Sequence, residues 1–165
     1  MPELTMEIDL AAPPERVWSV LTDFAAYPEW NPYQSIDGKA EPLAVVTVSS
    51  RGLDGRAFPT ARAGIWKLEP NRRLELGNGF PLWFASTRFF HLSESGRGTL
   101  LTHGARFSGL WAAWRFSHGH KIERLKPLYE AFGQALAQRL AGRKAPQPFQ
   151  KNRHSRRASK AKGRG

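Results

Sequence analysis

The chain contains no cysteine, and this absence excludes several kinds of chemistry. Without thiols the protein can form neither disulfide bonds nor thiolate-bound metal sites, and it cannot use a cysteine nucleophile. The sequence also lacks the Gly-x-Ser-x-Gly element that presents a serine nucleophile in many hydrolases. No sequence motif therefore identifies a nucleophile.

Long apolar runs are missing as well. No stretch approaches the roughly 20 apolar residues that a membrane span needs. The N-terminal segment MPELTMEIDL carries Glu3, Glu7 and Asp9 where a secretory signal peptide needs basic residues and an apolar run. By elimination, we expect a cytoplasmic protein. A length of 165 residues with 41% hydrophobic content suits one sizeable core and is too short for two ordinary domains.

Acidic residues are absent from residues 143–165, which hold nine of the 25 lysines and arginines. Residues 1–142 therefore carry 16 basic against 14 acidic side chains, although the whole chain has a net charge of +11. Phe149 is the only large apolar residue of the basic segment, so little apolar surface is available to offset the entropy lost on ordering. We expect one folded domain over residues 1–142 and a basic disordered tail over residues 143–165.

Hydrophobic periodicity indicates a strand followed by short helices at the start of the chain. Residues 5–10 alternate apolar and polar side chains with a period of two, which is typical of a half-buried strand. Val17, Leu21 and Phe24 then recur at helical spacing, so we expect a short amphipathic helix that Phe24 ends. Pro28 and Pro32 divide the aromatic-rich segment that follows, DFAAYPEWNPY, and favour a tight second helix.

The middle of the chain reads as an antiparallel meander. Turn-forming sequences such as GLDG, EPN, GNGFP and SESGRG separate short segments with strand composition. We predict strands near residues 35–40, 44–50, 56–68, 73–77, 83–92 and 99–107.

The helical period returns in the last part of the domain. Its apolar positions step by three and four residues: Ile122, Leu125, Tyr129, Phe132, Leu136 and Leu140. Pro127 lacks an amide hydrogen and crowds the carbonyl of Glu123, so the helix should kink or start afresh there. This order of elements favours an α+β helix-grip fold, in which a curved antiparallel sheet of six to seven strands wraps around a long C-terminal helix. Such a grip leaves space for a small molecule.

Three segments resemble the START-like (SRPBCC) superfamily, which includes the birch-pollen-allergen fold and the polyketide cyclases and dehydrases. They are PPERVWSVLTDFAAYPEWNPY, WKLEPNRRLEL and FFHLSESGRGTLLTHGARFSGLW, and they follow one another on the expected elements. The resemblance implies a hydrophobic cavity under the long helix, which the superfamily uses for lipids, sterols, polyketides and plant hormones. Only some members catalyse a reaction, so the fold alone does not assign an activity.

Strand parity singles out Arg88 and His103 as candidate interior polar groups. If Phe90 points inward, as in the Phe-x-Leu pattern of the superfamily, Arg88 shares its face, and His103 shares a face with Leu101 on the next strand. The pair could orient a ligand carbonyl or carboxylate, or His103 could transfer protons. Alternatively, His103 only bonds a neighbour and Arg88 reaches solvent at a sheet end. Ala105 stands where related sequences often carry an acid, which weakens an acid/base mechanism.

The bulky residues near this pair are candidates for the wall of the cavity, or for side chains that fill it. Our candidate ligand-binding residues are Tyr27, Trp30, Trp66, Phe80, Arg88, Phe90, His103, Phe107, Tyr129 and Phe132. We expect no cofactor and no metal, because His118 and His120 have no acidic ligand nearby in sequence.

Three functions remain open from the sequence. The first is binding of a small hydrophobic ligand, lipid-like, polyketide-like or aromatic, between sheet and helix. The second is a cyclase- or dehydrase-like enzyme in which Arg88 and His103 polarise a carbonyl. The third is an accessory protein that contacts RNA, DNA or anionic lipid weakly through residues 143–165, although a tail that only aids solubility is the simpler interpretation of that segment.

Overall fold

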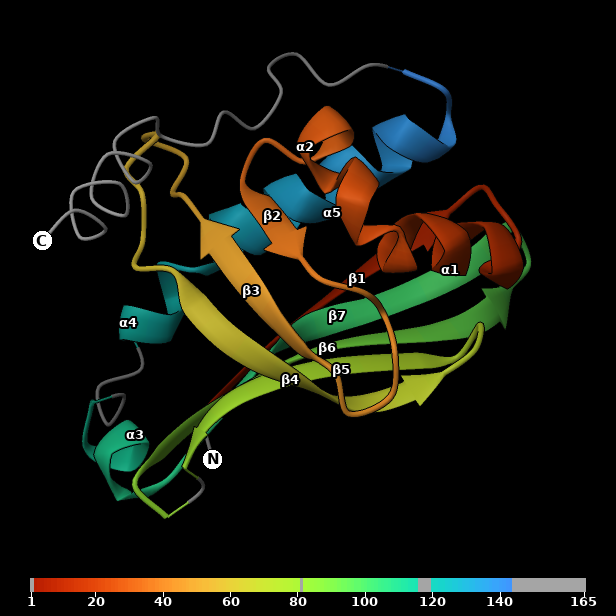
Figure 1. Ribbon diagram of the computed structural model, residues 1–165. Coiled ribbons are helices and arrows are strands. Elements are labelled where there is room, and N and C mark those ends of the chain that lie inside the picture. Colours follow the sequence, from red (N-terminus) through yellow and green to blue (C-terminus); the bar gives the residue numbers. More distant parts are fainter. Residues whose placement is uncertain (1, 81, 116–119, 144–165) are drawn as a thin grey trace, which may run out of the picture.

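The computed structural model of the protein describes residues 2–80, 82–115 and 120–143 (Figure 1). The described elements follow the predicted order of strand, short helices, further strands and long helix. In chain order they are β1 (Glu3–Leu10), α1 (Pro14–Thr22), the 3-10 turn η1 (Phe24–Ala26), α2 (Tyr27–Trp30), β2 (Gln34–Asp37), β3 (Val45–Ser50), β4 (Ala61–Glu69), β5 (Arg73–Phe80), β6 (Phe84–Ser95), β7 (Gly98–Ser108), α3 (Leu110–Arg115), α4 (His120–Glu123) and α5 (Lys126–Leu140).

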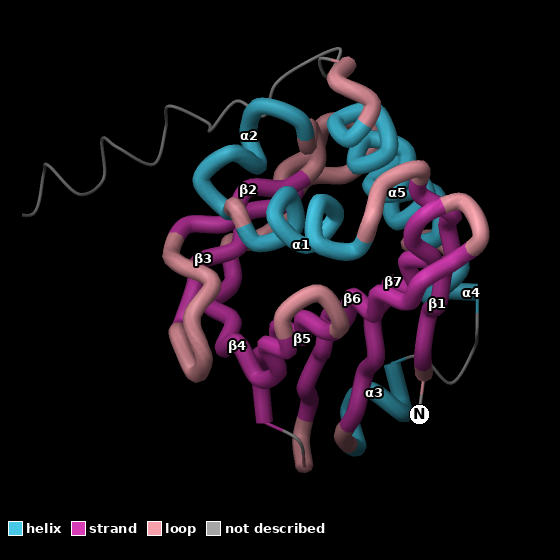
Figure 2. The backbone as a smooth tube through the Cα atoms, turned by 90° about the vertical axis from the view of Figure 1, so that its right-hand side faces the viewer, coloured by secondary structure: helices cyan, strands magenta, loops and turns pink. Residues whose placement is uncertain are grey.

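The seven strands form one antiparallel sheet in the order β1-β7-β6-β5-β4-β3-β2. Strands β2 to β7 pair with their neighbours in sequence, while β1 joins the far edge beside β7. The sheet curls, and α1, α2 and α5 lie on its concave side, as the end-on view in Figure 2 shows. The predicted α+β helix-grip fold is confirmed.

The core lies between the concave face of the sheet and α5. Phe132 and Leu136 of α5 belong to one buried cluster with Phe90 of β6, Leu101 of β7 and Trp30 of α2. The ring of Phe132 lies 5.5 Å from that of Phe90 and 5.6 Å from that of Trp30, measured between centroids. Burying side chains of this size contributes roughly 1.5–3 kcal/mol each, so these contacts hold the helix on the sheet.

The aromatic-rich segment after α1 folds into two short helical turns. Helix α1 ends at Thr22, so Phe24 opens η1 instead of ending the first helix as predicted. Asp23 causes this early end, because its Oδ1 accepts a hydrogen bond from the amide of Ala26 at 3.3 Å. Pro28 lies in the first turn of α2, where a missing amide hydrogen has no cost.

The long helix starts afresh at the proline, one of the two predicted outcomes. Pro127 occupies the first turn of α5, and the short helix α4 precedes it. Strand β4 begins at Ala61, later than predicted, because Pro59 has no amide hydrogen for the ladder. The predicted basic tail lies outside the described residues except for Arg143, and the domain boundary at residue 142 stays a prediction. None of the helices described is long and apolar enough to cross a membrane.

Candidate functional site

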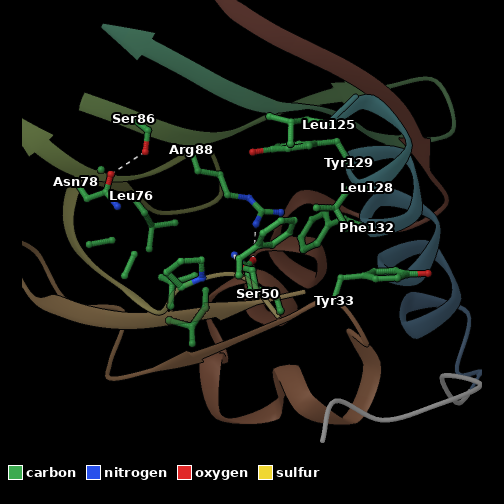
Figure 3. Close-up of a pocket in the computed structure, with 18 of the residues that line it drawn as sticks. Tyr33, Ser50, Leu76, Asn78, Ser86, Arg88, Leu125, Leu128, Tyr129 and Phe132 are labelled. Atoms are coloured by element: carbon green, nitrogen blue, oxygen red, sulfur yellow. Dashed lines mark hydrogen bonds between the residues drawn. The ribbon is translucent and has the colours of Figure 1, made fainter. Parts of the chain in front are cut away.

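A cavity of about 530 Å³ opens between the concave face of the sheet and the N-terminal half of α5 (Figure 3). Small-molecule sites typically measure roughly 300–1,000 Å³. Most of its walls are aliphatic and aromatic, with Leu76, Phe107 and Phe132 among them. The lining residues with polar or charged groups are few: Tyr33, Gln34, Ser50, Asn78, Ser86, Arg88 and Tyr129. The cavity therefore suits an apolar molecule with a small polar part.

Arg88 carries a positive charge into this cavity. Its side chain extends from the inner face of β6 toward Tyr129 and Phe132 of α5 (Figure 3). The guanidinium carbon lies 4.6 Å from the ring centroid of Phe132 and 5.1 Å from that of Tyr129, within the range of cation–π attraction. Nη1 donates a hydrogen bond to Oε1 of Gln34, whereas Nε is buried without a partner among the residues described.

The polar groups around the guanidinium are neutral. Gln34 is buried at the start of β2, just after the Asn31-Pro32 turn, and its Nε2 donates to Oγ of Ser50 at 3.4 Å. On the opposite wall Ser86 Oγ donates to Asn78 Oδ1 at 2.7 Å. Within the described part of the chain, no Asp or Glu lines the cavity. The positive charge of Arg88 therefore has no carboxylate partner there.

His103 faces the same interior as Arg88, as strand parity predicts, but it is enclosed. It lies opposite Phe90 on β7, is only 1% exposed, and is not among the residues that line the cavity. Its ring stacks at 2° to the ring of Phe90 and lies 5.5 Å from Phe132. Burial, with a smaller contribution from the charge of Arg88, lowers the pKa of His103 to about 3. The imidazole is therefore neutral at physiological pH.

Tyr27 and Trp30 fill the interior beyond the cavity. Both are almost completely buried, and their rings meet edge to face at 4.9 Å. The hydroxyl of Tyr27 donates to the carbonyl of Leu21 at 2.8 Å. Burial raises the pKa of Tyr27, so this hydroxyl keeps its proton. Trp30 packs behind Phe132 and plugs that end of the fold.

Trp66 and Phe80 lie outside the cavity. Trp66 is on the outer face of β4, where its indole covers Gly64 and the facing Gly77, and a Cβ on Gly77 would meet the ring at 2.3 Å. Phe80 ends β5 and is 72% exposed. Neither position could be read from the sequence, because aromatic residues of a core, a cavity and an outer face look alike.

The structure divides the ten candidate residues among four locations. Four line the cavity (Arg88, Phe107, Tyr129, Phe132), two lie in the wall behind it (Phe90, His103), two fill the core (Tyr27, Trp30) and two are on the outside (Trp66, Phe80).

Sequence reasoning missed Gln34, which accepts a hydrogen bond from Arg88, and Ser50, which accepts one from Gln34. In the sequence, Gln34 is only a polar residue shortly after a helix that a proline ends, and Ser50 is only a polar residue at the end of a strand. Such a pattern is a weak signal for a binding site. As to metals, the described residues bring no three His, Asp or Glu side chains together.

Comparison with known proteins agrees with this architecture. The family model described as "Polyketide cyclase / dehydrase and lipid transport" matches residues 1–141. Protein CV1439 from Chromobacterium violaceum has 16% identity, a TM-score of 0.66 and coverage of 84% of this chain and 96% of its own. Protein Ms6760 from Mycobacterium smegmatis has 19% identity, a TM-score of 0.64 and coverage of 86% and 92%, respectively.

The crystal structure of Ara h 8.0201 also shares the fold, with 14% identity, a TM-score of 0.64 and coverage of 85% of this chain and 97% of its own. No curated protein matches the chain. At these identities the solved structures carry the fold alone, whereas the family model spans both the sheet and the long helix that enclose the cavity. The chain therefore belongs to the polyketide cyclase/dehydrase and lipid transport family.

Proposed function

We propose that the protein binds one small, largely apolar molecule in the cavity between the sheet and α5. The observation that carries this proposal is the cavity itself, with about 530 Å³ of space, mostly apolar walls and few polar groups. Membership of the family supports it, because a hydrophobic ligand cavity is its general property. Lipid-like, polyketide-like and aromatic molecules all fit this chemistry.

The same geometry favours binding over a cyclase- or dehydrase-like reaction. A general base must come within hydrogen-bond reach of the proton that it removes. His103, the expected base, is enclosed by Phe90 and Phe132 and does not line the cavity. In the described walls no carboxylate takes its place. Arg88 remains as a group that can orient a ligand.

A pair of variants on β4 tests the proposal. Ala61 lines the cavity, whereas its neighbour Arg62 is exposed and points to the other side of the strand. N-Phenyl-1-naphthylamine, whose fluorescence rises in apolar surroundings, reports occupancy of the cavity. We expect the wild type and Arg62→Trp to bind this probe, and Ala61→Trp to lose at least about tenfold in affinity because the indole occupies its space.

Equal affinity of the two variants would contradict the proposal, provided that both melt cooperatively. Native mass spectrometry of the protein purified from its source adds a second measurement. A co-purified apolar molecule that is released chemically unchanged supports binding. A molecule that is chemically converted during incubation with the protein supports the enzyme alternative.

A further inference from the structure

Arg88, inside the protein, differs from arginines on its surface in having no carboxylate partner among the described residues. Arg73 pairs with Glu75 at 2.9 Å, Arg106 with Glu3 at 2.8 Å, and Arg139 with Glu29 at 3.0 Å. Arg88 has no such partner in the described part of the chain, although it is the arginine that faces an apolar cavity.

An unpaired charge in apolar surroundings is costly, so its local contacts matter. The rings of Phe90, Tyr129 and Phe132 lie 4.6–5.1 Å from the guanidinium carbon and offset part of the lost hydration. Gln34 accepts one of the five N–H groups. Neutral partners therefore hold the guanidinium in place and leave its positive charge uncompensated.

We propose that the ligand is a monoanionic amphiphile whose carboxylate binds Arg88 while its apolar body lies against the remaining walls of the cavity. This inference rests on the proposed function and narrows it to one chemical class. The planar guanidinium fork matches a carboxylate, which can accept two parallel hydrogen bonds from it. His103 is neutral and enclosed, so Arg88 supplies a single positive charge to the cavity.

The experiment compares ligands that differ in charge and little else. Decanoate, its methyl ester and decanol compete against bound N-phenyl-1-naphthylamine at neutral pH. We expect decanoate to displace the probe from the wild type at a concentration about tenfold to a hundredfold lower than either neutral compound. Arg88→Gln should abolish this preference, Arg88→Lys should keep part of it because the charge remains without the fork, and the exposed control Arg62→Gln should keep all of it.

The outcomes separate the inference from the proposed function. If the wild type binds the probe but decanoate and its methyl ester displace it equally, the carboxylate inference is overturned and the cavity function stands. Failure of the wild type to bind the probe or any of the three competitors overturns both. The ester comparison needs no variant, so it decides the matter even if Arg88→Gln does not fold.

A second, independent feature is a group of exposed apolar side chains beside the β5–β6 turn, which we call the apolar tip. Its six described members are 42–80% exposed: Phe80, Leu82, Trp83, Leu110, Trp111 and Trp114. Backbone hydrogen bonds hold the turn against α3, from Leu110 N to Leu82 O at 3.2 Å and from Trp111 N to Trp83 O at 3.0 Å. Figure 1 shows α3 beside this turn, away from α5. Contiguous apolar surface of this kind indicates an interaction site.

Charge and position indicate which partner covers the tip. Residues 107–122, which include α3, hold two basic residues, Arg115 and Lys121, and no Asp or Glu, and residues 76–93 contain no acid either. Residues 143–165 add nine positive charges to the chain. Phe84 lines the cavity and also stands 5.7 Å from the ring of Trp111, so the tip adjoins the cavity wall.

We propose that the apolar tip docks on the surface of an anionic lipid bilayer. Tryptophan, phenylalanine and leucine beside basic residues are the composition that inserts into the boundary between headgroups and acyl chains. The basic residues of the same chain add electrostatic attraction to anionic headgroups.

Paired leucine substitutions test this docking on the full chain. Leu82 and Leu110 are 80% and 76% exposed within the tip, whereas the control residues Leu43 and Leu53 are 85% and 54% exposed on other loops. We expect Leu82→Ser with Leu110→Ser to lower binding to phosphatidylcholine vesicles containing phosphatidylglycerol by about tenfold in a flotation assay. The control pair should bind like the wild type, and vesicles of phosphatidylcholine alone should bind all proteins more weakly.

Three results overturn the proposal. One is equal binding of the tip variant and the wild type, which would assign any vesicle binding to the charges alone. Another is no binding of the wild type to anionic vesicles. The last is a lipid-free dimer in analytical ultracentrifugation that the tip variant dissociates, because the tip would then be an interface between two copies of the chain.

Discussion

At the scale of single residues, His103 combines burial with an unsatisfied ring nitrogen. Its Nδ1 has no hydrogen-bond partner among the described residues, and aromatic rings surround it on the sheet and helix sides. Arg88 is the charged group that acts on His103, and its positive charge opposes protonation of the imidazole. Neither solvent nor a counterion would stabilise a second positive charge at this point, so protonation of His103 is coupled to opening of the structure.

Acid should therefore destabilise the protein before its carboxylates titrate. The pKa of His103 is lowered from 6.5 to about 3, so the unfolded chain binds this proton first and stability falls as the pH drops through that window. The loss should reach about 2 kcal/mol between pH 6.5 and 4.5. Urea unfolding at several pH values measures it, and His103→Leu should flatten the slope.

The pH range of 4.5 to 6.5 separates the effect of His103 from that of the carboxylates. The hydrogen bond from Arg106 lowers the pKa of Glu3, whose stabilising contribution is lost only as the pH falls below 4.5. A slope between pH 4.5 and 6.5 that is the same in His103→Leu and in the wild type would contradict the assignment.

The sequence predicts the faces of Arg88 and His103 because alternation along a strand is strict once one inward residue is known. It does not predict their different surroundings. Arg88 reaches the cavity and His103 does not, because Phe90 and Phe132 pack over the imidazole. That difference depends on contacts between β6, β7 and α5, which no local pattern contains.

At the scale of elements, a glycine in the middle of α5 lies over the sheet where His103 stands. A Cβ on Gly133 would lie 3.4 Å from Nε2 of His103 and 3.5 Å from Ile8, which is close to ordinary van der Waals contact. Because glycine costs a helix interior about 0.5–1 kcal/mol relative to alanine, Gly133→Ala should stabilise the protein by roughly that amount. Thermal unfolding should show a melting temperature about 1–4 °C higher.

Gly142 is the matched control. It follows α5 with a φ of +74°, where a side chain is strained although the space is open. Gly142→Ala should therefore lower the melting temperature. A lower melting temperature for Gly133→Ala would mean that His103 cannot yield the few tenths of an ångström that the methyl group needs.

Trp66 has an element-scale role on the outside of the sheet. Its indole covers the glycine pair Gly64 and Gly77 of β4 and β5, and so shields backbone that has no side chains of its own. We expect Trp66→Ala to destabilise the protein by roughly 1–3 kcal/mol in urea unfolding while the affinity for N-phenyl-1-naphthylamine stays unchanged. Trp83→Ala, in the exposed apolar tip, should change stability by less than about 0.5 kcal/mol. Weaker probe binding by Trp66→Ala would contradict this role and would indicate that Trp66 contacts the ligand.

Elements were predictable where turn chemistry punctuates the chain. Glycine and proline turns bound the strands of the meander, and Pro127 marks the start of α5. The small displacements have local causes, such as the Asp23 cap that ends α1 early. Helix α3 was not predicted, because Leu110, Trp111 and Trp114 bury little and so lack an apolar stripe facing a core.

At the scale of the whole molecule, the cavity lies between a curled sheet of seven strands and the long helix α5. The order of elements predicts the grip, and the sheet topology confirms it. Whether aromatic side chains fill the space depends on packing alone. Trp30 and Tyr27 occupy one end, while the region around Arg88 stays open.

The net charge of the chain is concentrated in its last 23 residues. Residues 1–142 have 16 basic and 14 acidic side chains, so removing residues 143–165 lowers the net charge from +11 to +2. Because attraction to polyanions depends on released counterions, retention of the full chain on heparin should fall steeply with salt. The shortened chain should not be retained even at low salt, while its affinity for N-phenyl-1-naphthylamine is preserved.

A full-length variant with the nine basic residues of 143–165 changed to glutamine separates charge from length. We expect it to elute from heparin like the shortened chain, because counterion release depends on charge and not on the mere presence of the segment. Retention of either variant at the salt concentration that elutes the wild type would place the polyanion contact on residues 1–142. The near-neutral balance of those residues argues against that result, since their basic side chains are matched almost one for one by acids on the same domain.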